Sequence, residues 1–237
     1  MSDLFNALGN AILKPLTDIA EQVTGAVFQA VTFPFQIVQG AVQSFEEAAD
    51  RAADDAAVRD ARAHLHDYLN NLHPEVLKLA QRIEDAASHY IAEAPRLRSL
   101  ADDLENSGSG TADIRGTLKT FRNSFGSALE GADELVQRTR DSREVLLSDL
   151  KRMSVRQKQS VANAAVKFRP VVEQIGKTVD LIEAWRDQAL VLDSQLQNVL
   201  AKMKTLDAAR TAFLLRAHLD ATEKVVKDLH TQADATE

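Results

Sequence analysis

The chain has 237 residues, a hydrophobic fraction of 45% and a net charge of −7, which allows one large folded domain or two small ones. It contains no cysteine, which excludes disulfides, thiolate catalysis and cysteine metal sites. Aromatic residues make up only 5%, glycine and proline are few, and alanine, leucine and valine supply most of the apolar side chains. Because alanine and leucine lead the helix-propensity scale, this composition predicts helix almost throughout.

The N-terminal fifth, residues 4–45, is nearly free of charge. It holds only Lys14, Asp18 and Glu21, and residues 22–45 hold no charged side chain at all. Apolar residues recur there at spacings of three and four, which predicts one helical stripe facing a membrane or a partner: Phe28, Val31, Phe35, Val38, Val42 and Phe45. A second stripe beside it is polar but uncharged: Gln29, Thr32, Gln36, Gln39 and Gln43.

This segment is long enough to cross a bilayer but is not uniformly apolar. The 24 residues from 22 to 45 would reach about 36 Å as a helix. The polar stripe and Pro34, which should kink or break the helix, argue against a constitutive transmembrane span. They favour an amphipathic segment that lies on membranes, inserts conditionally or packs against partner helices.

The first residues lack the basic and apolar regions of a secretory signal. The sequence therefore leaves the location open between the cytoplasm and export by a route that reads no such signal, and a segment 1–45 that binds lipid would place the protein at the periphery of a membrane.

The rest of the chain is densely charged and shows helical periodicity along most of its length. Capping boxes at Ser44 and Ser154 predict that helices begin there, the latter after a break near Met153. Pro74 predicts the start of a new helix, and Pro95 predicts a kink.

The segment 106–111, Asn-Ser-Gly-Ser-Gly-Thr, predicts a hairpin turn between two long antiparallel helices, with Thr111 capping the second. The longest apolar seam runs from 161 to 206. We predict an all-α fold, an elongated bundle of three to five long, coiled-coil-like helices with an apolar N-terminal helical segment. Its predicted parts are the N-terminal segment 1–45, the bundle 46–230 and a frayed tail 231–237.

Charge changes sign along the body. Residues 46–105 carry 14 acids and 7 bases, residues 106–169 carry 7 acids and 12 bases, and residues 170–237 carry 11 acids and 8 bases. Opposite signs favour helices that lie side by side, so we expect the central basic run to pair with acidic helices or face solvent. Contact with anionic lipid is the alternative, and nucleic acid is disfavoured because acids dilute the run. The run comprises Arg138, Arg140, Arg143, Lys151, Arg152, Arg156, Lys158, Lys167 and Arg169.

No motif of a metal, phosphate or catalytic site is present in the sequence. We therefore predict a non-enzymatic protein without a cofactor. Trp185 is expected in a helix seam or interface, and Tyr68 and Tyr90 at the edge of the core. The histidines lack the spacing of helical metal sites and are expected to be solvated or partly packed: His64, His66, His73, His89, His218 and His230.

Three hypotheses account for the uncharged segment. In the first, it binds or inserts into membranes, since uncharged polar residues are cheaper to desolvate than ions, and oligomerises into a pore. In outline this resembles α-helical pore-forming toxins, which join long helical bundles to an amphipathic or apolar segment; the resemblance is architectural and no motif carries it. In the second, the segment packs into a homo- or hetero-oligomeric assembly or coats a surface. In the third, it is the central helix of an ordinary bundle. The expected partners are therefore lipid or sister subunits.

Overall fold

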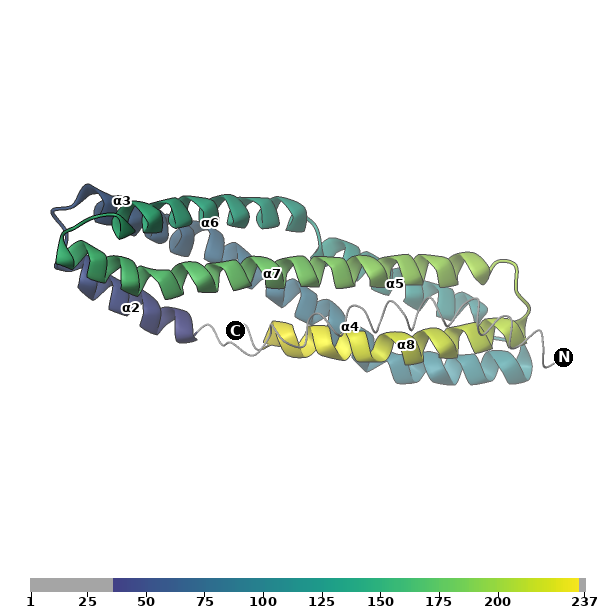
Figure 1. Cartoon of the computed structure of the whole chain (residues 1–237). Coiled ribbons are helices and arrows are strands. Elements are labelled where there is room, and N and C mark those ends of the chain that lie inside the picture. The colour runs from purple at the N-terminus through teal and green to yellow at the C-terminus, as the bar shows by residue number, and fades with distance from the viewer. Residues whose placement is uncertain (1–35, 235–237) are drawn as a thin grey trace, which may run out of the picture. The chain divides into compact units, whose positions relative to one another are not determined.

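The computed structural model describes residues 36–234, and every regular element within them is a helix (Figure 1). The predicted all-α bundle is therefore confirmed, with five long helices, α4 to α8, of 18 to 44 residues. In chain order the elements are α2 (Gln36–Asp50), α3 (Ala56–Asp67), the π-helix η1 (Tyr68–Leu72), α4 (His73–Ser107), α5 (Thr111–Ala128), α6 (Ala132–Ser154), α7 (Gln159–Lys202) and α8 (Ala208–Asp234).

These helices form two compact units, and α4 and α7 contribute to both of them. Of the described residues, unit 1 comprises 81–130 and 185–234, which gives it most of α4, all of α5, the end of α7 and α8. Unit 2 comprises 36–80 and 131–184, which gives it α2, α3, η1, the start of α4, α6 and most of α7. Each unit buries its own apolar side chains.

In unit 2, α3 packs against α2, η1 and α6, and Figure 1 shows α3 beside α6. The π-helix lies where α3 meets Pro74. Proline has no backbone N–H, so the carbonyl four residues before it loses its usual α-helical partner. The chain widens there, and the N–H of His73 donates to the carbonyl of Tyr68, five residues back. Pro74 then lies in the first turn of α4, as the sequence predicted.

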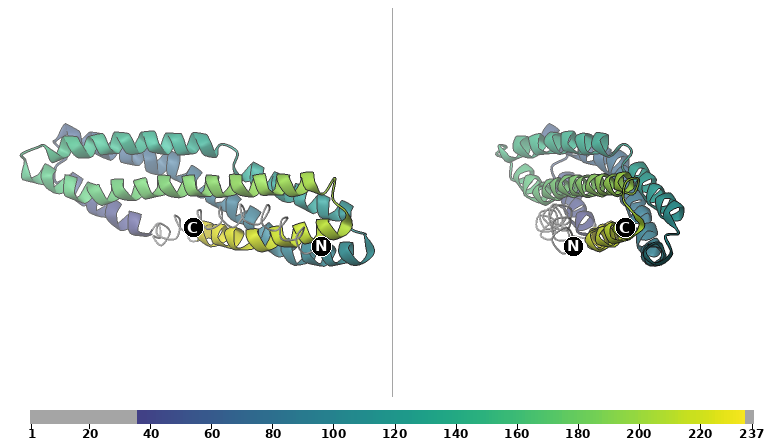
Figure 2. Two further views of the ribbon diagram at one scale, coloured as in Figure 1. Left: turned by 45° about the vertical axis from the view of Figure 1, so that its right-hand side comes forward. Right: turned by 90° about the vertical axis from the view of Figure 1, so that its right-hand side faces the viewer.

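In unit 1, aromatic rings from α4 and α5 pack together. The Tyr90 ring lies 4.8 Å from Phe121 and 6.5 Å from Phe125, measured between centroids. The Tyr90 hydroxyl forms a hydrogen bond with the hydroxyl of Thr222 in α8, so one side chain joins three helices. Both views in Figure 2 show α8 beside α4, in agreement with the ion pairs of Arg98 with Asp220 and Glu223.

The hairpin at 106–111 is confirmed, since α4 ends at Ser107 and α5 begins at Thr111. The predicted cap is wrong, because Gly110 precedes the first turn with a φ of 92° and no side chain caps the helix. A left-handed backbone favours glycine at that position. The predicted break near Met153 is confirmed, because α6 ends at Ser154.

Neither capping box forms. Helix α2 continues through Ser44, and the Ser154 hydroxyl donates to the carbonyl of Leu150 within its own helix. Two turns were not predicted, at 51–55 and at 129–131. In the first, the Asp55 carboxylate accepts from the N–H of Ala57 at 2.9 Å and caps α3. In the second, Gly131 has a φ of 78°.

Candidate functional site

Helix α2 carries the described end of the uncharged segment and rests on the core of unit 2. Phe45 is 0% exposed, and its ring centroid lies 4.5 Å from that of Phe168 in α7. The two rings are inclined by 38°, an arrangement typical of packed aromatic pairs. One turn further on, Ala48 and Ala49 are also buried. The last residue of the predicted apolar stripe is therefore part of a protein core in this structure.

Ion pairs between α2 and α3 flank the contact of Phe45 with Phe168. The Glu46 carboxylate lies 2.5 Å from Nη2 of Arg62 and 3.0 Å from Nε2 of His66. Arg62 also donates to Asp50 at 2.9 Å. The apolar contact and this cluster together fasten the C-terminal half of α2 to unit 2.

The two predicted stripes are described only at their C-terminal ends. Val42 is half-buried and Phe45 is fully buried, whereas Gln39 and Gln43 are exposed. Within α2 the apolar stripe thus turns towards the protein and the polar stripe away from it. Gln36 and Val38 belong to α2, but nothing is described of their side chains. The remaining stripe residues lie outside the described part of the chain, as does Pro34: Phe28, Gln29, Val31, Thr32 and Phe35.

Between residues 36 and 234, none of the helices combines the length and the apolar character needed to cross a bilayer.

A second polar cluster joins α3 to α6 within unit 2. Nδ1 of His64 lies 2.7 Å from Oδ2 of Asp149, a carboxylate that is only 2% exposed. Arg152 donates to the other oxygen of Asp149 at 3.3 Å and to Asp60 at 2.8 Å. The hydrogen bond with Asp60 raises the pKa of Arg152. This cluster was not predicted, because His64 and Asp149 lie 85 positions apart in the chain.

The expectation that the histidines are solvated or partly packed is wrong for His218. This side chain is 1% exposed, and neither ring nitrogen has a hydrogen-bond partner among the described residues. Burial lowers the pKa of His218 to about 4. Burial also lowers the pKa of His73, which lies beside the ring of Tyr68. His64, His66 and His89 are exposed, as expected.

The predicted pairing of the basic run with acidic residues is confirmed for five of its nine members. The Arg138 guanidinium binds both carboxylate oxygens of Glu75, at 2.7 and 3.2 Å. The other four pairs are Arg140 with Glu183, Arg152 with Asp60, Arg156 with Asp55 and Lys158 with Asp54. These pairs lie within unit 2, and most of the run's charge is thereby compensated.

The large side chains of Trp185, Tyr68 and Tyr90 are buried in the core. Trp185 is 0% exposed and lies in the seam of α7, as predicted. Tyr68 and Tyr90 were expected at the edge of the core, but they are 2% and 1% exposed. Burial raises the pKa of each tyrosine to about 12.

In the described residues, no group of three or more histidine and carboxylate side chains is placed to hold a metal ion. The fold and these contacts define an all-α, helical-bundle protein built from two units. Comparison of the chain with protein-family models, with curated proteins and with solved structures finds no match in any of the three.

Proposed function

We propose that this chain is a non-enzymatic helical-bundle protein whose segment 22–45 binds to or inserts into lipid membranes. One observation carries the proposal. The exposed face of α2 is uncharged before Phe45, at Gln39, Gly40 and Gln43, and charged after it, at Glu47 and Asp50. The exposed face of α2 thus changes from uncharged to charged at Phe45, the residue through which α2 packs on unit 2.

The physical argument compares the free energy needed to remove the uncharged part and the charged part of this α2 face from water. Ionised side chains are expensive to bring to a membrane, whereas glutamine amides can exchange water for hydrogen bonds to headgroups or sister helices. Burying an apolar side chain contributes roughly 1.5–3 kcal/mol. Transfer of three members of the apolar stripe would therefore supply on the order of 5 kcal/mol, enough for reversible binding.

The charge of the chain supports a hydrophobic rather than an electrostatic mode of membrane binding. The net charge is −7, and five members of the basic run are paired with carboxylates. We therefore expect membrane binding to depend only weakly on salt and on anionic lipid.

Gly40 favours an oligomeric form of the bound state. A Cβ added at this position would meet no atom within 4 Å, so the surface of α2 is open there. Small residues on an open helix face allow a second helix to approach closely, as in helical pores. Assembly of membrane-bound copies through this face is the pore-forming version of the proposal.

Liposome flotation and dye release test the proposal in the full-length chain. Val31→Lys places a charge on the apolar stripe, and Gln39→Lys places the same charge on the exposed polar stripe as a matched control. Flotation and release that are lost with Val31→Lys and kept with Gln39→Lys support the proposal. Equal behaviour of the two variants contradicts it.

A deletion complements the substitutions, and the structure decides where to cut. Removing residues 1–45 would take Phe45 out of the core of unit 2, so the deletion should end before Gln36. Loss of flotation in this shorter chain supports the proposal. Absence of lipid binding by the full-length chain, together with an oligomer that dissociates on deletion, would instead identify an assembly protein.

A further inference from the structure

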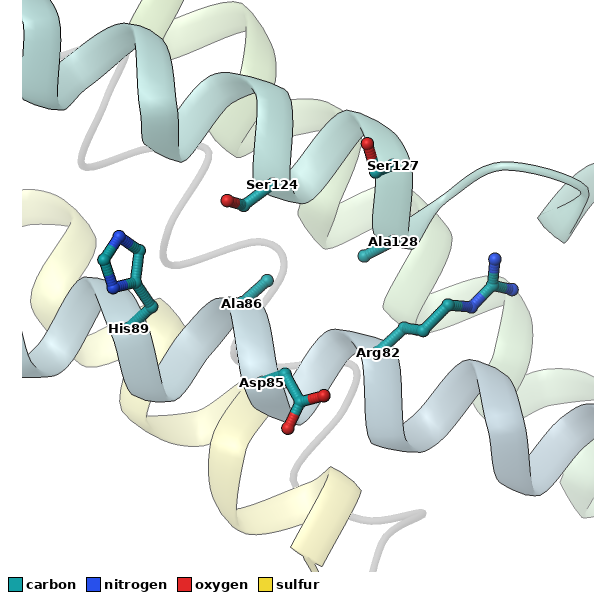
Figure 3. Close-up of a pocket in the computed structure, with 7 residues that line it drawn as sticks. All are labelled: Arg82, Asp85, Ala86, His89, Ser124, Ser127 and Ala128. Carbon is teal, nitrogen blue, oxygen red and sulfur yellow. The ribbon is translucent and has the colours of Figure 1, made fainter.

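An open groove lies between α4 and α5 of unit 1, far along the chain from α2 (Figure 3). Its volume is about 260 Å³, and its apolar floor is formed by Ala86 and Ala128, both nearly fully buried. The groove exists because two small side chains face each other where larger ones would fill the space between the helices.

The walls of the groove carry polar side chains from both helices. Arg82, Asp85 and His89 come from α4, and Ser124 and Ser127 come from α5. Figure 3 shows Ser124 and His89 facing each other, with Arg82 towards the opposite end. Seven residues separate Arg82 from His89, so the groove extends over about 10 Å of helix.

The two serine hydroxyls are not used within the described structure. Hydroxyl side chains in these helices commonly donate to the carbonyl four residues back, as Thr117, Thr120 and Thr139 do. Ser124 and Ser127 have no partner in residues 36–234. The Ser124 hydroxyl lies on the side of His89 in Figure 3, whereas the exposed Ser127 hydroxyl is turned away from α4 and reaches a molecule in the groove by rotation about its Cα–Cβ bond.

The charged groups of the groove are held in place from outside it. Arg82 donates once, to the carbonyl of Glu130 at 3.2 Å, which leaves most of its five N–H donors unused. The Asp85 carboxylate accepts from Gln81 at 3.2 Å. The His89 ring rests edge-on against Phe121, with centroids 5.3 Å apart and an angle of 70°. The side chains thus have defined directions.

Donors exceed acceptors in this groove. A guanidinium with neighbouring serine hydroxyls is a set that binds phosphate oxygens, through charge-assisted hydrogen bonds. The single carboxylate disfavours a second anionic group but accepts from a hydroxyl, and His89 offers a further polar contact beyond it. The chemistry is that of a ligand with one phosphate and a short hydroxylated chain.

From this arrangement we infer that the α4–α5 groove binds a small phosphorylated polyol. The phosphate lies between Arg82 and Ser127, and the hydroxyl groups lie towards Asp85, Ser124 and His89. The same chemical group occurs in free glycerol phosphate and in a glycerol-bearing lipid headgroup. This site does not depend on the proposed membrane function, because it involves no residue of segment 22–45.

The test is titration of the ¹⁵N-labelled full-length chain with sn-glycerol 3-phosphate, followed by amide chemical shifts. We expect saturable shifts confined to residues 81–90 and 120–130. Arg82→Gln should weaken binding about tenfold, because it removes a charge-assisted hydrogen bond, and Ser127→Ala should weaken it several-fold. Arg96→Gln is the matched control: Arg96 is exposed on α4 outside the groove, and its removal should leave affinity within twofold.

Two further titrations separate the possible sources of the ligand. Inorganic phosphate should bind more weakly than sn-glycerol 3-phosphate, and equal affinity would contradict the role assigned to the hydroxyls. Phosphatidylglycerol vesicles are tested on Val31→Lys chains with and without Arg82→Gln. Vesicle binding that is weaker with Arg82→Gln shows that the groove also binds a lipid headgroup. Absence of saturable shifts with both the free compound and the vesicles, or equal loss in Arg96→Gln, would overturn the inference.

Discussion

Substitution of His218 offers a sharp test of the core of unit 1. The imidazole is 1% exposed, neither nitrogen has a partner in the described structure, and burial lowers its pKa to about 4. In the unfolded chain the same group has a pKa near 6.5. Between these two values the unfolded state binds one more proton than the folded state, so acid favours unfolding.

The size of the effect follows from the two pKa values. Above pH 6.5 the His218 ring is neutral in both the folded and the unfolded chain, so its protonation does not lower the free energy of unfolding. As the pH falls from 7 to 5, His218 alone should lower the free energy of unfolding by about 2 kcal/mol. His218→Leu removes the titrating group at similar volume. It should abolish this part of the pH dependence and stabilise the protein at pH 7 by about 1 kcal/mol.

Urea unfolding followed by circular dichroism, at pH 7 and pH 5, measures the effect. The informative quantity is the difference in unfolding free energy between His218→Leu and the natural sequence, because all other titrating groups are common to both chains. This difference should grow by about 2 kcal/mol at pH 5. Leu215→Ala serves as control, because it changes a buried side chain that does not titrate, and it should show no such growth. A difference that is the same at both pH values would refute the reasoning.

Two further predictions concern packing and turns. Phe45→Ala should destabilise unit 2 by about 3–5 kcal/mol, as for other buried phenylalanines, and a melting temperature equal to that of the natural sequence would contradict the seat of α2 on Phe168. Gly131→Ala should cost about 1 kcal/mol because its φ is 78°, whereas Gly116→Ala, in an open helical position, should stabilise by up to about 1 kcal/mol. Chemical denaturation of the glycine pair checks the opposite signs.

Much of the fold could be predicted from the spacing of apolar residues, because helical periodicity depends only on local sequence. The turn at 106–111 could also be predicted, because its run of glycine and serine is typical of a turn. The turn at 129–131 was missed because nothing in the sequence separates Gly131, with a positive φ, from Gly116 within a helix. Ser44 looked like a cap, but the packing of Phe45 on Phe168 favours continuation of α2 through it.

The sites were harder to predict, because they depend on helices that meet far along the chain. The apolar stripe was visible as a pattern, yet the pattern could not show that Phe45 belongs to the core of unit 2. The contact of His64 with Asp149 and the burial of His218 also arise only from tertiary packing. The α4–α5 groove comes from alanines on two facing helices, a coincidence that no single segment reveals.

Site-specific fluorescence tests the membrane proposal most directly, and the absence of native cysteine makes the labelling unambiguous. A single cysteine at Val31 or at Gln39, carrying a polarity-sensitive dye, is read with and without phosphatidylcholine vesicles in the otherwise natural chain. Insertion of the apolar stripe predicts a blue-shifted, brighter signal at position 31 and a much smaller change at position 39. Spectra at position 31 that vesicles leave unchanged would contradict the proposal.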